Sequence, residues 1–408
     1  MSKTLATLRE KTDSLLFATY GRYPIAIAEG HGSRLRDFDG KEYIDLLSGI
    51  AVTNLGHCRP EIAEVTAAQA CKLVHVSNLF YQEEQLVLAE RLLNTTHFGK
   101  AFFCNSGAEA NEAAIKLARR RQQRLKNKYA YEIITFEGCF HGRTLATVAA
   151  TGQAKFQDGF APMPEGFLQI PWGDPQALEA AVSDKTAGVL LEIIQGEGGV
   201  RPASAEFAHA VACICKDKDI LFIVDEVQTG MGRTGNYWAF QHFGLKPDIM
   251  TAAKALANGL PMGAMLSTDE TAHAFVPGSH ASTFGGGALV SAVAAKVLEI
   301  MERDKLPQRA AELGGGAIER FRAVQSACPD SIREVRGMGL MIGIELTNPG
   351  REVWEKLLQS GFILNLTQER VLRLLPPLII EKEDLESFAV CLETILKAGS
   401  ADTRAKRP

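Results

Sequence analysis

Short apolar runs alternate with amphipathic segments through the middle of the chain. The run at 101–104 is broken by Asn105-Ser106-Gly107, and a helical pattern with alanines on one side follows over 108–125. Further apolar runs predict strands at 133–136, 189–194, 220–224, 249–252 and 262–266, with helices such as 206–216 between some of them. Apolar strands that alternate with helices are typical of a largely parallel sheet covered on both faces. We therefore predict an α/β domain here.

The C-terminal third has a different pattern. Long helices are predicted at 288–303 and 307–325, followed by short strands at 332–335, 340–346, 362–365 and 371–374 and a last helix at 383–397. This mixture indicates a smaller α+β domain. We divide the chain into an N-terminal segment (1–50) that packs with the small domain, a large domain (51–300) and the small domain (301–408).

Composition and charge narrow the function classes. Of 408 residues, 46% are hydrophobic, and 44 Lys and Arg against 48 Asp and Glu give a net charge of −4. This balance predicts neither a nucleic-acid nor a membrane partner. No run reaches the ~18 apolar residues of a membrane span, and the start lacks a signal core, which favours a cytoplasmic protein. The eight scattered cysteines form no CxxC pair and are expected to be reduced, and the dispersed histidines predict no metal site.

A glycine-containing turn joins the first apolar run to its helix. Ser106 and Glu109 have capping-box spacing, and Gly107 lets the backbone turn tightly. Free N–H groups and the positive end of the helix dipole at such a turn favour a phosphate. An ordinary helix cap fits the same pattern, and the residues alone leave both interpretations open.

Two further positions carry charge beside apolar strands. Asp225 and Glu226 follow the strand at 220–224, where open sheets place ligands, although a surface acid or a helix cap fits equally well. Lys254, 29 residues after Asp225, lies among small residues. Taken singly, a lysine that reaches the surface is the better interpretation. Together with a phosphate turn and an acid, a desolvated lysine that forms Schiff bases meets the needs of pyridoxal phosphate.

Several segments, in order, resemble the class-III (subgroup II) aminotransferases. The similarity runs from about Tyr20 to the last helix, and it implies fold type I of the pyridoxal-phosphate enzymes, with a seven-stranded sheet domain, a small domain and a homodimer whose sites lie at the interface. The segments that carry it are 56–58, 105–107, 140–144, 195–199, 225–235, 253–256 and 336–340.

The resemblance implies a role for each matching residue. Lys254 corresponds to the lysine that bonds to pyridoxal 5'-phosphate and moves the proton, and Asp225 to the acid on the pyridine nitrogen. Thr283 corresponds to a phosphate contact donated by the partner subunit. The remaining cofactor-binding positions are Ser106, Gly107 and Ala108 of the phosphate turn, Phe140 stacked on the ring, and Val227 and Gln228.

Arginines are expected to set the substrate class, a small-molecule amine and a 2-oxo acid. Arg143 matches the arginine that binds a substrate carboxylate. Arg373 lies in an apolar run, where a charge needs a partner if it is buried, although an edge-strand arginine could also point to water. In the family this position binds the α-carboxylate of glutamate, and Glu197 pairs with it when the amine substrate lacks that group. Tyr20, Ile50 and Ser282 complete the expected substrate site.

The nearest subgroup is the acetylornithine aminotransferases. Ornithine δ-aminotransferases carry Tyr where this chain has Ile50, and the apolar Ile50 suits an acylated amine. We therefore expect δ-amino transfer from N2-acetylornithine to 2-oxoglutarate, as in arginine biosynthesis. The alternatives inside the class are ω-aminotransferases of succinyl-ornithine, succinyl-diaminopimelate, ornithine or 4-aminobutyrate.

Two alternatives lie outside this class, and some positions depart from the family. Residues 230–235 match GxGxxG, but they do not follow their strand directly or open a helix, which argues against a nicotinamide oxidoreductase. The possibility of a non-catalytic binding protein of the same fold stays open.

The chain departs from the family at three places: Ile193, Ala257-Asn258 and Gly287-Ala288 replace the usual Pro, Gly-Gly and Asn-Pro.

Overall fold

A seven-stranded sheet forms the centre of the larger part of the molecule. The computed structural model describes residues 4–405. The strand order is β4-β12-β11-β10-β7-β5-β6, and only β12 runs antiparallel to its neighbours. The prediction of a mostly parallel seven-stranded sheet is confirmed. Its strands are β4 (Lys100–Cys104), β12 (Gly263–Ser267), β11 (Ile249–Ala252), β10 (Leu221–Asp225), β7 (Thr186–Leu191), β5 (Glu132–Phe136) and β6 (Phe167–Ile170).

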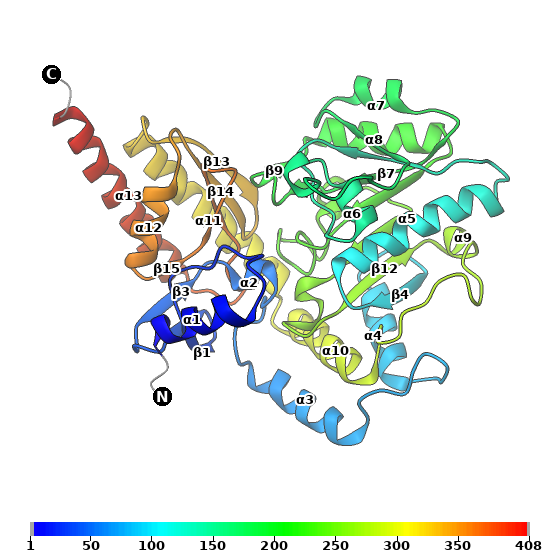
Figure 1. Ribbon diagram of the computed structural model, residues 1–408, viewed down its shortest axis with the longest axis horizontal. Coiled ribbons are helices and arrows are strands. Elements are labelled where there is room, and N and C mark those ends of the chain that lie inside the picture. The colour runs from blue at the N-terminus through cyan, green and yellow to red at the C-terminus, as the bar shows by residue number, and fades with distance from the viewer. Residues whose placement is uncertain (1–3, 406–408) are drawn as a thin grey trace.

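Helices cover both faces of this sheet (Figure 1). Successive residues of a strand point to opposite faces. Accordingly Ile223 packs with Ala114 of α5, whereas Val224 shares a core with Phe207 of α8. The buried strands thus place α5 on one face and α8 on the other. The helices of this part are α3 (Pro60–Lys72), α4 (Glu83–Leu93), α5 (Gly107–Arg124), α6 (Leu145–Ala150), α7 (Pro175–Ala181), α8 (Ala205–Asp217), α9 (Asp269–Ala272) and α10 (Ala288–Arg303), with short 3-10 turns at Ala154–Phe156, Ala239–Phe243 and Lys254–Ala257.

A second, antiparallel sheet of order β13-β14-β17-β16 lies in the C-terminal part. Helix α11 packs on β13 and β14, and α13 packs on α11 and α12. The predicted α+β character of this part is confirmed. Its elements are β13 (Ile332–Met338), β14 (Met341–Leu346), β16 (Asn365–Thr367), β17 (Val371–Leu374), α11 (Leu306–Ala327), α12 (Arg351–Gln359) and α13 (Lys382–Ala405), and a two-stranded hairpin of β8 (Ile194–Gln195) and β9 (Arg201–Pro202) contacts β13.

The N-terminal segment lies beside the C-terminal part (Figure 1). Strands β1, β2 and β3 form a sheet with β15, in which Ile44 is the parallel neighbour of Phe362. The elements are α1 (Leu5–Leu15), β1 (Ile27–His31), β2 (Arg34–Asp37), β3 (Glu42–Asp45), α2 (Ser48–Ala51) and β15 (Phe362–Ile363). Within residues 4–405, no helix is long and apolar enough to span a bilayer, and no three His, Cys, Asp or Glu side chains gather as a metal-binding group.

Three consecutive glycines in α11 allow a matched test of this packing. A Cβ on Gly314 would lie 2.0 Å from the carbonyl oxygen of Gly339, in the turn between β13 and β14, whereas a Cβ on Gly315 would meet nothing within 4 Å. We expect Gly314→Ala to lower the free energy of unfolding by about 1–3 kcal/mol. Gly315→Ala should raise it by about 0.5–1 kcal/mol, because alanine loses less backbone entropy in a helix. Urea titration of both variants checks this, and equal effects would contradict the close approach of α11 to that turn.

Candidate active site

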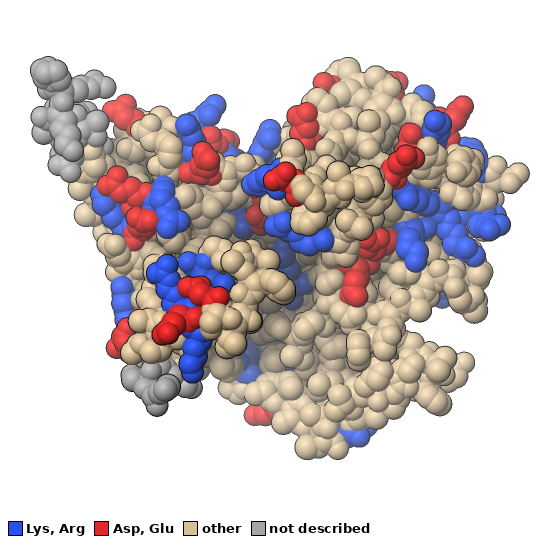
Figure 2. Space-filling model, in the orientation of Figure 1, with Lys and Arg blue, Asp and Glu red and all other residues tan. Residues whose placement is uncertain are grey.

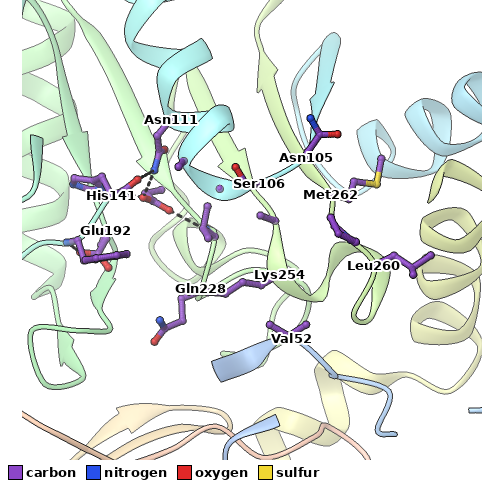
Figure 3. Close-up of a pocket in the computed structure, with 18 of the residues that line it drawn as sticks. Val52, Asn105, Ser106, Asn111, His141, Glu192, Gln228, Lys254, Leu260 and Met262 are labelled. Atoms are coloured by element: carbon purple, nitrogen blue, oxygen red, sulfur yellow. Dashed lines mark hydrogen bonds and ion pairs between the residues drawn. The ribbon is translucent and has the colours of Figure 1, made fainter. Parts of the chain in front are cut away.

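A cavity of about 340 Å³ opens where four strands of the large sheet end (Figure 3). Asn105 follows β4, Glu192 follows β7, Asp225 ends β10, and Lys254 comes two residues after β11. All four line the cavity. Ligands of open α/β sheets bind at this edge. Four segments far apart in the sequence therefore supply polar groups to one cavity.

The first wall is the turn that leads into α5. Ser106 caps the 18-residue helix by accepting a hydrogen bond from the Glu109 N–H at 3.2 Å. The Glu109 carboxylate accepts from the Asn105 N–H at 2.6 Å, so the reciprocal bond reaches one residue further back than in a standard capping box. First-turn N–H groups have no partner within a helix. Ser106, Gly107 and Ala108 line the cavity, and the helix start favours an anion there.

Gly107 also sets how closely this turn approaches the opposite loop. A Cβ at position 107 would lie 2.7 Å from Cγ1 of Val227. Glycine therefore permits the contact between the turn at the start of α5 and the loop after β10, which carries Val227 and Gln228 into the cavity.

Asp225 is held by three donors at the base of the cavity. Its Oδ2 accepts from Asn111 Nδ2 and from the His141 ring, both at 2.8 Å, and its Oδ1 accepts from the Val227 N–H at 3.0 Å. Thr251 in turn donates to the Asn111 amide oxygen at 2.8 Å. The carboxylate is 4% exposed, so its orientation is fixed by a buried network (Figure 3).

His141 supplies positive charge to this network. Burial alone lowers the pKa of His141, but Cys139 and the hydrogen-bonded Asp225 outweigh burial and raise it well above the usual value. Its Nε2 is buried and has no partner among the described residues. The Asp225 carboxylate is thus held beside His141 at the base of the cavity, where it can face a cationic ring nitrogen.

Lys254 reaches the cavity from a strained backbone position. Its φ is +46°, which few residues other than glycine adopt. Burial lowers the pKa of Lys254, and Arg373 adds to this shift, whereas Glu197, Asp225 and Glu192 oppose it. A lysine with a lowered pKa has more of its amine uncharged near neutral pH, and the uncharged form is the nucleophile.

Arg373 and Glu197 meet at the small-domain side of the site. Arg373 on β17 is 1% exposed, and its Nη1 donates to Glu197 Oε1 at 2.6 Å and to Gln228 Oε1 at 3.3 Å. Burial would raise the pKa of Glu197, but Arg373 outweighs burial and lowers it. The Arg373 Nε is buried without a partner among the described residues. The expectation that this arginine is buried and paired with Glu197 agrees with the geometry.

Phe140 and Arg143 mark the outer wall. Phe140 lines the cavity, and the Arg143 guanidinium lies 5.5 Å from the centre of the Phe140 ring and 4.1 Å from that of Phe156. Arg143 is exposed and does not line the cavity. It forms no ion pair within the described residues, so its charge is available to an anion beside Phe140.

Seven predicted site residues do not line the cavity of this chain: Arg143, Glu197 and Arg373, described above, and Thr283, Tyr20, Ser282 and Ile50. Thr283 and Tyr20 are exposed, the latter by 75%. Ser282 Oγ instead accepts from Asn105 Nδ2 at 3.3 Å. Ile50 is 37% exposed, and Val52, two residues on, lines the cavity instead.

Sequence reasoning also missed residues that the structure brings into the site. His141 and Asn111 bind Asp225 directly. His141 lies inside the segment 140–144 of the family resemblance, and Asn111 lies in the helix predicted at 108–125. Each is a polar residue among positions whose pattern predicts burial. A buried polar side chain usually has a hydrogen-bond partner, so this pattern could have identified both residues. Val52, Leu260 and Met262 are apolar and carried no such signal.

Sequence comparisons reveal relatives over almost the whole chain. The family described as Aminotransferase class-III matches residues 17–396. The acetylornithine aminotransferase of Methanocaldococcus jannaschii is 45% identical over 376 residues, which cover 92% of this chain and 94% of that protein. The acetylornithine aminotransferase of Bacillus subtilis is 45% identical over 389 residues, covering 95% and 99%.

Solved structures share the fold over the same length. The ornithine aminotransferase of Toxoplasma gondii superposes with a TM-score of 0.95 at 30% identity, over 99% of this chain and 96% of that one. The acetylornithine aminotransferase of Elizabethkingia anophelis superposes with a TM-score of 0.87 at 31% identity, over 97% of this chain and 100% of that one.

Proposed function

The chain belongs to the class-III aminotransferases, and from this premise we propose that it transfers the δ-amino group of N2-acetylornithine to 2-oxoglutarate with pyridoxal 5'-phosphate as cofactor. The products are N-acetylglutamate 5-semialdehyde and glutamate. The observation that carries the proposal is the buried Arg373 with its free Nε, paired with Glu197 beside Lys254. This arrangement suits a reaction in which one substrate brings a second carboxylate and the other does not.

The residues present fit the cofactor. A turn at the start of α5 suits its phosphate, and Asp225 with charged His141 suits its ring nitrogen. Phe140 and Val227 line the same cavity, and Gln228, which also lines it, accepts a hydrogen bond from Arg373. Pyridoxal phosphate, when bound, supplies an electron sink for negative charge on the substrate carbon.

The side chains of the site then have separate roles in the reaction. Lys254 Nζ takes a proton from the carbon that carries the amino group and returns it on the cofactor side of the site. Arg143 at the entrance orients the α-carboxylate of acetylornithine while Glu197 keeps Arg373 neutralised. When 2-oxoglutarate enters, its carboxylate replaces Glu197 on Arg373, which selects dicarboxylates for the second half-reaction.

Ornithine is the second candidate amine, because structures of ornithine aminotransferases superpose closely on this chain. Ile50 favours the acylated substrate, since it offers no hydrogen-bond partner to a free α-amino group. Coupled assays of the purified protein on both amines decide between them. We expect a higher kcat/KM for acetylornithine, and equal or better kcat/KM for free ornithine would overturn the substrate assignment. Turnover of succinyl-ornithine in the same assay tests the breadth of acyl groups accepted.

We also propose that the protein is a cytoplasmic homodimer in which Thr283 reaches the partner's phosphate site. Thr283 is exposed and lies outside the cavity of its own chain. Beside it, Leu79, Tyr81 and Phe284 are 87%, 103% and 64% exposed, and Asn78 donates to the Ser282 and Gly285 carbonyls. Figure 2 shows that the surface over α3, α4 and α10 carries few charged side chains. Such a patch is typical of a protein–protein interface.

A charge in this patch should break the dimer. We expect Tyr81→Asp to shift the mass in light scattering from twice the chain mass toward the 44.3 kDa of one chain, because the carboxylate would have to be buried without a partner. Tyr129→Asp is the matched control, since Tyr129 is 80% exposed beside Tyr131 on another surface. An unchanged mass for Tyr81→Asp would contradict this interface.

A further inference from the structure

Glu192 is a buried acid of the cavity that the proposed reaction leaves without a role. It follows the last residue of β7, and Leu191 is the parallel neighbour of Val224 on β10. Glu192 therefore stands beside Asp225 at the same edge of the sheet. It is 6% exposed and lines the cavity, and it forms no ion pair among residues 4–405. Burial raises the pKa of Glu192 to about 7, with His141 opposing and Asp225 adding to the shift.

The two oxygens of Glu192 hold two different segments of the site. Oε2 accepts from the backbone N–H of Phe140 at 3.0 Å, and Oε1 accepts from the backbone N–H of Gly196 at 3.3 Å. Phe140 forms one wall of the cavity, and Gly196 directly precedes Glu197. Buried N–H groups need acceptors, so neither segment can shift without losing its bond.

The backbone at Gly196 has little room to move. A Cβ on Gly196 would lie 2.2 Å from the Gln228 Oε1, which also accepts from Arg373. The backbone before Glu197 is thus pressed against a side chain that lies beside Lys254 in the cavity (Figure 3). A movement of Gly196 would displace both Gln228 and Glu197.

We propose that Glu192 is a positioning residue that joins the ring wall at Phe140 to the carboxylate switch at Glu197. Its two carboxylate oxygens bind backbone N–H groups, and it acts through the two segments that carry them. The inference rests on the proposed function, because it assigns Phe140 to the cofactor and Glu197 to the choice of carboxylate. It predicts that cofactor affinity and dicarboxylate recognition are lost together when one oxygen of Glu192 is replaced.

Glu192→Gln makes this replacement with almost no change of shape. An amide has one acceptor oxygen, and its NH₂ would face an N–H group at either Phe140 or Gly196. Glu226→Gln is the matched control. Glu226 is 1% exposed, burial raises its pKa to about 7, and it accepts from the Thr229 hydroxyl and from the Phe240 N–H at 2.9 Å, but it does not line the cavity.

The experiment uses the holoenzyme and the cofactor-free protein of each variant. We expect both substitutions to lower the melting temperature of the cofactor-free protein. Only Glu192→Gln should weaken the binding of pyridoxal phosphate, measured by fluorescence quenching, and raise the KM for the oxo-acid substrate, each by roughly fivefold to tenfold, which corresponds to one lost hydrogen bond.

Three outcomes are decisive. If Glu192→Gln changes only the melting temperature, as Glu226→Gln does, the positioning role is overturned. If Glu192→Gln fails to fold, Glu192→Asp replaces it, because aspartate keeps both oxygens at a shorter reach and should show the same paired losses. If the unmutated protein neither binds pyridoxal phosphate nor turns over, the proposed function fails, independently of the result for Glu192.

Discussion

Replacing Lys254 by alanine is expected to lower kcat by about 10⁴-fold while the folded structure persists. The lysine supplies the cavity's one amine with a pKa lowered by burial, and no other lysine lines this cavity within the described residues. Stopped-flow measurement of each half-reaction checks the loss, and both should fall, because the proton transfer is common to them. Melting curves check the fold.

Lys218→Ala is the control, since Lys218 is exposed at the end of α8. Its kcat should match that of the unmutated protein. Small primary amines added to Lys254→Ala should restore part of the rate by supplying the missing base. Near-normal turnover of Lys254→Ala without added amine would refute the assignment of the proton-transferring group.

Arg373→Met should impair the half-reaction of the oxo acid and leave the half-reaction of acetylornithine almost unchanged. The KM for the oxo-acid substrate is expected to rise by about 10²-fold or more, because a buried charge–carboxylate contact is lost. The acetylornithine half-reaction, in which Glu197 occupies Arg373, should keep a rate within about threefold. Single-turnover kinetics with each substrate measure the two effects independently.

Stability and recognition can be separated in the same experiment. Arg373→Met leaves the Glu197 carboxylate without its partner, and breaking a buried pair in this way costs about 3–5 kcal/mol when both groups are desolvated. Glu197 is 27% exposed, so the free energy of unfolding should fall by less than that range. Adding Glu197→Gln should recover stability but not the affinity for 2-oxoglutarate. Arg333→Met is the control, since Arg333 is 72% exposed, and it should change neither the stability nor the affinity for 2-oxoglutarate. If Arg373→Met slowed both half-reactions equally, the exchange of Glu197 for the substrate carboxylate on Arg373 would be refuted.

The fold could be read from the sequence where strands are fully buried. Every residue of β7, β10 and β11 is buried, and such strands appear as mostly apolar runs, each with one polar residue: Thr186, Asp225 and Thr251. Strand β6 escaped notice because it is an edge strand whose burial is only partial. The strand predicted at 189–194 instead spans Thr186–Leu191, and the chain bends at Ile193 before β8 begins at Ile194. The apolar pattern does not show where this strand ends, because Glu192 is buried by residues that are distant in the sequence.

The site could be predicted where one residue type is needed for its chemistry. Lys254, Asp225 and the turn at Ser106 were identified in this way, and they line one cavity. The residues that orient them could not be found by spacing. Asn111 and His141 reach Asp225 across 114 and 84 residues of sequence, and only the folded chain brings them within 2.8 Å.

The pairing of β3 with β15 bears on how the polypeptide is made. Ile44 leaves the ribosome long before its parallel neighbour Phe362. The large sheet lies between them in the sequence, so it can form during synthesis while β3 still has an open edge. Closing so long a loop is slow. Nascent chains halted before Phe362 should therefore keep the N-terminal sheet incomplete and sensitive to protease, although the residues that build the large sheet are already present.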